Sequence, residues 1–278
     1  MKIKLTALAA SATLLLTGCG LVGGDTDSVG EEDGGITKLT VGATPVPQGD
    51  VLRFVDENLA EDAGLDLEVT EYTDYTLPNK ALSDGDIDAN YFQHKPYLDS
   101  EVEGQGYELT AFDPINLEPF ALFSKSIKDV DDLPKGAKVG INNDPANQGR
   151  ALKMLEEAKV ITLKDGVAAV DAKLSDVEDN PKDVEFVEAD AAQLARTLDD
   201  VDASVINGNN ALEAGLSPAK DGIVLEDAKD NPYGNFLAAR TANKDDENIK
   251  KLDELLHSPE VKKFIEDKWS DGSVLPSF

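Results

Sequence analysis

From residue 36 onward, short apolar runs typical of strands alternate with stretches that have the apolar spacing of amphipathic helices. The run at 39–42 is of the strand type, and Val51, Leu52, Val55 and Leu59 then follow with the spacing of one helix face. Further strands are expected at 65–69, 120–124, 138–141, 184–188, 203–206, 223–225 and 236–239, and further helices near 77–84, 147–158, 191–199, 209–214 and 246–268. This alternation predicts an α/β protein with mostly parallel sheets.

The chain of 278 residues is long enough for two domains of ordinary size. No Pro-rich or Gly-rich linker interrupts the alternating pattern, and no repeat of fixed period is present. Two lobes, if present, would therefore be joined by strands that cross between them rather than by a flexible linker.

The charge balance excludes several classes of partner. The sequence has 26 Lys and Arg against 55 Asp and Glu, for a net charge of -29. Nucleic-acid binding needs a cationic surface over the phosphates, and docking on an anionic bilayer needs basic clusters. Neither a nucleic acid nor an electrostatically bound membrane is expected as a partner.

The first nineteen residues have the pattern of a lipoprotein signal. A basic start at residues 1–4 precedes an apolar run at 5–16, which is too short to span a bilayer. The run ends in Leu16-Thr17-Gly18-Cys19, which resembles a bacterial lipobox. We expect residues 1–18 to be a signal peptide and Cys19, the only cysteine, to be lipidated; the alternative is a buried thiol after an ordinary signal.

Residues 19–35 are rich in Gly, Asp and Glu and show no periodicity. Such a segment buries too little apolar surface to become ordered, so it is expected to be a flexible tether. Removal of residues 1–18 takes away two lysines and no acid, which changes the net charge from -29 to -31.

Polar and aromatic residues follow several of the predicted strands. Residues 142–144 come after the strand at 138–141, and residues 207–210 after the strand at 203–206. Tyr72, Tyr75, Tyr91, Phe92 and Tyr97 follow the strand near residue 67. Ligands of α/β proteins bind beyond the carboxyl ends of strands or between domains, so these residues are candidates for a binding site.

Enzymatic motifs are missing from the sequence. It has no Gly-x-Ser-x-Gly elbow, Walker loop or His-Glu-x-x-His, and its histidines are His94 and His257 alone. The acidic stretch 84–90 lacks the Gly and Glu positions of an EF-hand when counted from Asp86. We therefore expect no enzyme, no cofactor and no metal site.

Two local features leave alternatives open. The aromatic residues between residues 72 and 97 could pack in the hydrophobic core or line a ligand-binding pocket. The Asp, Asn, Gln and His residues interleaved with them favour a pocket. Arg150, near the start of a predicted helix, could grip a carboxylate with two parallel hydrogen bonds or form a surface salt bridge.

Several longer motifs resemble one known family. They are VGATP (41–45), LPNKAL (77–82), GDIDAN (85–90), FQHKPYL (92–98), NNDPAN (142–147), GRAL (149–152), VIN (205–207) and PYGN (232–235). Together with the lipobox, these stretches are similar to the NlpA/MetQ family, the lipid-anchored substrate-binding proteins of bacterial methionine ABC importers. The resemblance extends from about residue 39 to residue 278.

The resemblance implies a two-lobed, type II-like periplasmic-binding-protein fold in which two crossing strands form the hinge. One lobe would comprise residues 36–118 and 235–278, and the other residues 119–234. It also implies roles for eight residues: Tyr75, Phe92, His94 and Tyr97 would wall a side-chain pocket, Arg150 would bind an amino-acid carboxylate, and Asn147, Asn207 and Asn235 would fix its charged groups. The alternative for these three asparagines is to form turns or cap helices.

The function implied is capture of methionine outside the cytoplasm and its delivery to an ABC permease with a cytoplasmic ATPase. The protein would be a monomer held on the cell membrane by the lipid on Cys19. Two stretches, 45–49 and 208–210, depart from the family pattern, so a dipeptide or another apolar amino acid is an alternative ligand. The competing function is that of a lipid-anchored adhesin without a small-molecule ligand.

Overall fold

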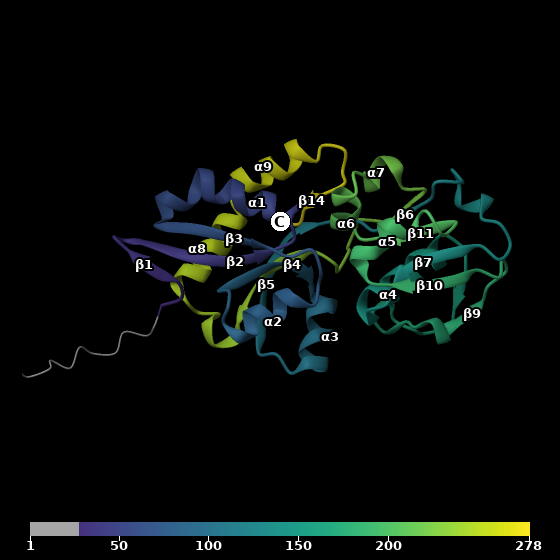
Figure 1. Ribbon diagram of the computed structural model, residues 1–278, viewed down its shortest axis with the longest axis horizontal. Coiled ribbons are helices and arrows are strands. Elements are labelled where there is room, and N and C mark those ends of the chain that lie inside the picture. The colour runs from purple at the N-terminus through teal and green to yellow at the C-terminus, as the bar shows by residue number, and fades with distance from the viewer. Residues whose placement is uncertain (1–27) are drawn as a thin grey trace, which may run out of the picture.

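The computed structural model describes residues 28–278, in which two sheets form two lobes side by side (Figure 1). The predicted signal peptide, Cys19 and the first part of the predicted tether lie outside these residues. Within residues 28–278, no helix is long and apolar enough to cross a bilayer.

Lobe 1, as named here, is built on a seven-stranded sheet with the order β1-β2-β4-β13-β5-β14, in which β3 pairs with β2. Its strands are β1 (Glu31–Asp33), β2 (Ile36–Ala43), β3 (Leu65–Glu71), β4 (Ala89–His94), β5 (Leu109–Leu117), β13 (Asn235–Arg240) and β14 (Leu275–Pro276). Its helices are α1 (Gln48–Val55), α2 (Leu77–Asp84), α3 (Lys95–Gln105), α8 (Glu247–Leu256) and α9 (Pro259–Lys268).

Lobe 2 is built on a five-stranded sheet with the order β10-β7-β11-β6-β12. Its strands are β6 (Ala121–Phe123), β7 (Lys138–Asn142), β10 (Glu185–Ala189), β11 (Ala203–Ile206) and β12 (Val224–Leu225). Its helices are α4 (Pro145–Glu157), α5 (Ala191–Thr197), α6 (Gly208–Glu213) and α7 (Pro218–Asp221), and a small hairpin pairs β8 (Thr162–Leu163) with β9 (Val177–Asp179).

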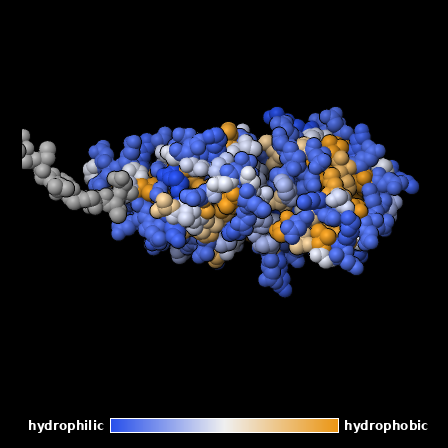
Figure 2. Space-filling model, turned by 90° about the horizontal axis from the view of Figure 1, so that it is seen from below, coloured by the Kyte–Doolittle hydropathy of each residue, from blue (hydrophilic) through white to orange (hydrophobic). Residues whose placement is uncertain are grey.

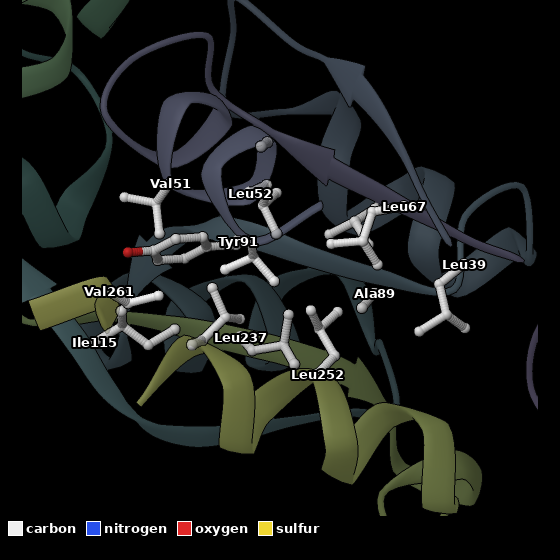
Figure 3. Close-up of a cluster of buried hydrophobic side chains, with 14 of the residues drawn as sticks. Leu39, Val51, Leu52, Leu67, Ala89, Tyr91, Ile115, Leu237, Leu252 and Val261 are labelled. Carbon is white, nitrogen blue, oxygen red and sulfur yellow. The ribbon is translucent and has the colours of Figure 1, made fainter. Parts of the chain in front are cut away.

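Helices cover both faces of each sheet, because successive strand residues point to opposite faces. In β13, Leu237 and Ala239 join the core beneath α1, α8 and α9, whereas Phe236 and Ala238 join the core beneath α2 and α3. Figure 3 shows the first of these cores, with Leu237 directed toward the side chains of the C-terminal helices. Both lobes thus have the three-layer arrangement of α/β proteins.

The expectation of mostly parallel sheets is wrong, because both sheets are mixed. Strand β2 runs parallel to β3 and β4, and β7 runs parallel to β10 and β11. The remaining pairs are antiparallel, including those that β13 makes with β4 and β5. The cause is the chain path: β5 leaves lobe 1 and β13 returns to it beside β5, so these neighbours run in opposite directions.

The chain passes between the lobes twice, after β5 ends at Leu117 and before β13 begins at Asn235. The lobe boundaries expected at 118/119 and 234/235 fall in these two connections and stay a proposal. On the side of α7, Ser217 donates a hydrogen bond to Asp271 and Lys220 forms an ion pair with Asp271, both at 3.0 Å. These contacts join α7 to the segment between α9 and β14 (Figure 1).

The tether expected at residues 19–35 was predicted to extend too far, because its last residues belong to the folded lobe. Residues 31–33 form β1, which pairs with β2 through a two-residue turn at Gly34 and Gly35, both with positive φ. Such a turn favours glycine at both positions, and the Gly-Gly pair is its sequence signal. Val29 is buried, its N–H donates to Asp246 at 2.9 Å and its carbonyl accepts from Asn248.

The single helix expected at 246–268 is two helices, α8 and α9. Pro259 has no N–H to donate and cannot continue α8, so the chain restarts there. Ser258 caps the new helix by accepting a hydrogen bond from the N–H of Val261. Sequence reasoning also missed β4, α3 and β5.

Candidate binding site between the lobes

A small cavity lies between the lobes. All eight residues assigned to the site from the sequence line it: Tyr75, Phe92, His94, Tyr97, Asn147, Arg150, Asn207 and Asn235. Five further residues line it: Gln93, Glu118, Phe120, Gly208 and Asn209.

One part of the cavity is aromatic. Tyr75, Phe92 and Tyr97 from lobe 1 pack with Ala146 of lobe 2. The Tyr75 ring lies 5.9 Å from that of Phe92 and 5.8 Å from that of Tyr97, and the three rings are tilted or edge-on to one another. The Tyr97 hydroxyl donates to the backbone carbonyl of Tyr75 at 3.0 Å. This compartment suits an uncharged, apolar group.

His94 ends β4 and caps α3. Its Nδ1 accepts the N–H of Tyr97 at 3.2 Å, so the ring proton lies on Nε2, which donates to Asn147 Oδ1 at 3.1 Å. Burial, together with the positive charge of Arg150, lowers the pKa of His94 to about 3. His94 is therefore a neutral donor that links lobe 1 to lobe 2.

A pH dependence of folding follows from His94. An unfolded histidine binds a proton near pH 6.5, whereas native His94 stays neutral down to about pH 3. Between these values the unfolded chain binds more protons, so the free energy of unfolding falls as the pH is lowered from about 6.5 toward 3. Urea unfolding at pH 7 and pH 5 is expected to show a smaller loss of stability in His94→Gln than in wild type. Equal losses would contradict this account.

Asn147 holds other site residues in place. Its Oδ1 accepts from His94 and from Asn207 Nδ2, both at 3.1 Å, and its Nδ2 donates to Asp144 at 3.0 Å. The cap of α4 is Asp144, which accepts the N–H of Asn147. The capping alternative is therefore wrong for this side chain, whose amide instead connects His94, Asp144 and Asn207, and a contact with a ligand stays a prediction.

Asn207 precedes α6 but makes no capping hydrogen bond. Its Oδ1 accepts from Asn142 Nδ2 at 2.8 Å, and its Nδ2 donates one proton to Asn147. An amide nitrogen carries two protons, so one donor of Asn207 is left without a partner among residues 28–278.

Arg150 forms a buried ion pair with Glu226. Nε lies 2.8 Å from Oε1 and Nη2 lies 2.5 Å from Oε2, with side-chain exposures of 3% and 9%. Nη2 also donates to the carbonyl of Glu118 at 3.0 Å. The salt-bridge alternative thus has a real partner, but one in the interior rather than on the surface.

One nitrogen of the Arg150 guanidinium, Nη1, has no hydrogen-bond partner among residues 28–278. Its Cζ lies 3.8 Å from the ring centre of Phe120 and 4.3 Å from that of Tyr233, so two aromatic faces hold its plane. Within residues 28–278, Nη1 makes no hydrogen bond, and Arg150 lines the cavity. An anion in the cavity would find in Nη1 a fixed, charged donor.

Glu118, which sequence reasoning missed, lies directly after β5 in the first connection between the lobes. Its Oε1 accepts from Asn235 Nδ2 at 2.8 Å, from Asn116 Nδ2 at 2.9 Å and from Gln48 Nε2. Burial raises the pKa of Glu118, and these three hydrogen bonds oppose that shift. A Cβ at Gly208 would lie 2.6 Å from Cβ of Glu118, which explains the glycine there.

Two acceptors beside the hinge are unused. Neither Oε2 of Glu118 nor Oδ1 of Asn235 has a hydrogen-bond partner within residues 28–278, and both residues line the cavity. The two side chains are in contact, since Asn235 Nδ2 donates to Oε1 of the same carboxylate. A cationic donor would be held by both.

The polar groups of the cavity therefore divide into donors and acceptors. Among residues 28–278, Arg150, Asn207 and Asn209 offer unused N–H groups, whereas Glu118 and Asn235 offer unused oxygens. A buried zwitterion needs this pairing, because an unpaired charge in an apolar site is costly. Within residues 28–278, no group of three or more His, Cys, Asp or Glu residues is placed to hold a metal ion.

The chain is similar in sequence to known proteins. The family model described as NlpA lipoprotein matches residues 39–278. The methionine-binding lipoprotein MetQ of Bacillus subtilis is 42% identical over 266 residues, which cover 95% of this chain and 96% of that one. The D-methionine-binding lipoprotein MetQ of Salmonella typhi is 41% identical over 264 residues, 94% of this chain and 93% of the relative.

A solved structure is also similar. It is that of a nutrient-binding protein from Burkholderia cenocepacia bound to methionine. Its sequence is 44% identical, the TM-score is 0.83, and the match covers 86% of this chain and all of the other. The relatives are thus named as binding proteins.

Proposed function

The chain belongs to the NlpA lipoprotein family, and from this premise we propose that it is the substrate-binding lipoprotein of an ABC importer that captures methionine between its lobes. The observation that carries the proposal is the combination of unused donors at Arg150 and Asn207, unused acceptors at Glu118 and Asn235, and one aromatic compartment. The names of the relatives and the methionine in the similar solved structure support the choice of ligand.

In the proposed complex, the ligand carboxylate binds Arg150 Nη1 and the unused proton of Asn207. The ligand ammonium binds Glu118 Oε2 and Asn235 Oδ1. Hydrogen bonds to charged partners are stronger than neutral ones, so these four contacts fix the amino-acid backbone. Asn147 acts indirectly, by holding His94 and Asn207 in place.

The methionine side chain enters the aromatic compartment. An unbranched thioether fits an irregular space, and sulfur contacts with aromatic rings contribute about 0.3–1.5 kcal/mol each. Tyr75, Phe92 and Tyr97 supply three such rings. A charged side chain would lose its hydration there without gaining a partner of opposite charge.

Binding and transport follow from movement of the two lobes. The described structure is closed, since His94 of lobe 1 contacts Asn147 of lobe 2 across the cavity. A ligand shifts the equilibrium toward this state only by contacting it better than the open one, and the site does so because its groups come from both lobes. The closed form would then dock on a permease served by a cytoplasmic ATPase.

We place the protein on the outer face of the cell membrane, held by lipid on Cys19, and expect it to act as a monomer. The names of the relatives as lipoproteins support this placement. The acidic composition is consistent with a protein that lies in water outside the bilayer. Figure 2 shows hydrophilic residues over most of the visible face of both lobes.

A thermal-shift screen against the twenty amino acids and a set of dipeptides tests the proposal. The protein would be a chain that starts at Gly20, without the lipid. A ligand present at a hundred times its Kd stabilises the native state by about 2.7 kcal/mol, which raises Tm by roughly 5 °C or more. Methionine is expected to give the largest shift. No shift with any of these compounds would contradict the proposal and favour an adhesin.

A further inference from the structure

The side-chain hydroxyl of Tyr75 forms hydrogen bonds that connect the two lobes. Tyr75 lies between β3 and α2 in lobe 1, and its ring is part of the aromatic compartment. Its Oη donates to Asn209 Oδ1 at 2.5 Å and accepts from Asn210 Nδ2 at 3.0 Å. Both asparagines belong to α6 of lobe 2 and are 5% and 6% exposed.

The other aromatic rings of the compartment have no such link. Phe92 has no polar group on its ring, and the Tyr97 hydroxyl bonds to the backbone of Tyr75 within lobe 1. Tyr75 is therefore held at both ends, by Tyr97 at its carbonyl and by α6 at its hydroxyl. Burial raises the pKa of the Tyr75 hydroxyl, which keeps it protonated and able to donate.

The two asparagines are matched to this hydroxyl. A phenol has one proton to donate and lone pairs that accept, and here it meets one amide oxygen and one amide nitrogen. Both of its hydrogen-bonding capacities are met at the same time, by neighbouring residues of one helix. The arrangement exists only while the lobes are closed, because its members belong to different lobes.

We propose that Asn209 and Asn210 are positioning residues that clamp Tyr75 as a lid over the ligand side chain, and that this clamp sets how slowly methionine leaves. The proposal rests on the proposed function. Entry precedes closure, so the clamp is absent when the ligand arrives and present when it departs. It should thus act on the dissociation rate and leave the association rate nearly unchanged.

The expected size follows from the two hydrogen bonds. Each contributes a factor of roughly three to ten to an equilibrium constant once exchange with water is allowed for. Tyr75→Phe keeps the ring and removes both bonds, so the dissociation rate of methionine is expected to rise about tenfold or more. Asn209→Ala removes one bond and is expected to raise it about fivefold.

A double-mutant cycle tests the clamp by stopped-flow measurement of methionine binding. If the hydroxyl and Asn209 act through each other, Tyr75→Phe combined with Asn209→Ala should release methionine little faster than Tyr75→Phe alone. Tyr91→Phe is the matched control, because its hydroxyl donates to Asn116 within lobe 1 and makes no hydrogen bond to Tyr75 or α6 among residues 28–278. Its effect should multiply with that of Asn209→Ala. Asn209→Asp keeps the acceptor oxygen and should release more slowly than Asn209→Ala.

Two results would overturn the clamp. Effects of Tyr75→Phe and Asn209→Ala that simply multiply, or dissociation rates equal to that of wild type, would contradict it while leaving methionine binding intact. A wild-type chain that does not bind methionine at all would overturn both the clamp and the proposed function. Circular dichroism of each variant would show that it is folded, so that a changed rate reports on the closed state.

Discussion

Replacement of Arg150 by alanine is expected to weaken methionine binding by about a hundredfold or more. The ligand carboxylate would lose the charged donor Nη1 in a site that excludes water, and a buried charge without its partner costs about 3–5 kcal/mol. Isothermal titration calorimetry on wild type and on Arg150→Ala measures the loss. Arg150 is held in place by Glu226, Phe120 and Tyr233, and no other Lys or Arg among residues 28–278 lines the cavity.

A second variant separates binding from folding. Arg150→Ala also strands the buried carboxylate of Glu226, so the free energy of unfolding should fall as well. The double variant Arg150→Ala with Glu226→Gln removes that charge and should regain stability in urea without regaining affinity. If the double variant binds methionine as wild type does, Arg150 serves only the ion pair, and the carboxylate has another partner.

Glu118→Gln is expected to weaken methionine binding by ten- to a hundredfold. The variant keeps an oxygen that accepts from Asn235, Asn116 and Gln48, so the hinge network should remain. It replaces Oε2, which faces the ligand ammonium in the proposed complex, with an amide that donates. A hydrogen bond to a charged group contributes about 1.5–3 kcal/mol, which corresponds to this loss.

A methionine analogue without the amino group provides the control for the proposed contact between Glu118 and the ligand ammonium. A methionine analogue without the amino group lacks the partner of Oε2, so wild type should bind it much more weakly than methionine. Glu118→Gln should distinguish the two compounds far less. Equal discrimination by wild type and variant would show that the ammonium binds elsewhere.

Much of the fold could be predicted from the apolar pattern, because half-buried elements show their period. The helix expected at 77–84 is α2, and the strand expected at 203–206 is β11. By contrast, β4 is buried at every position and shows no alternation, and α3 buries only Tyr97 and Leu98. These two elements lack a period to detect.

The mixed character of the sheets could not be predicted from local pattern. It depends on where β13 inserts after more than a hundred residues in lobe 2, and no local signal encodes that choice. The break between α8 and α9 could have been found, since Ser258-Pro259 is a helix start signal inside the apolar pattern.

Some residues of the candidate site could likewise be predicted from the sequence, and others could not. The aromatic residues and amides stood out because aromatics are only 6% of the chain. Glu118 and Glu226 did not, because they are two among 55 acidic residues and their roles arise from tertiary placement. One signal was present for Glu118: it stands between Leu117 and the Pro119-Phe120 pair, an unusual place for a solvated acid.

The central claim is that one methionine binds in the cavity between the lobes, and calorimetric titration tests it most directly. The chain from Gly20 would be unfolded in urea, dialysed and refolded, so that no ligand from the cells occupies the site. We expect heat of binding with a stoichiometry of one methionine per chain and a micromolar or lower Kd. We also expect Arg150→Ala and Glu118→Gln each to weaken or abolish this binding. Absence of binding by the refolded wild type, or unchanged affinity in both variants, would contradict the account.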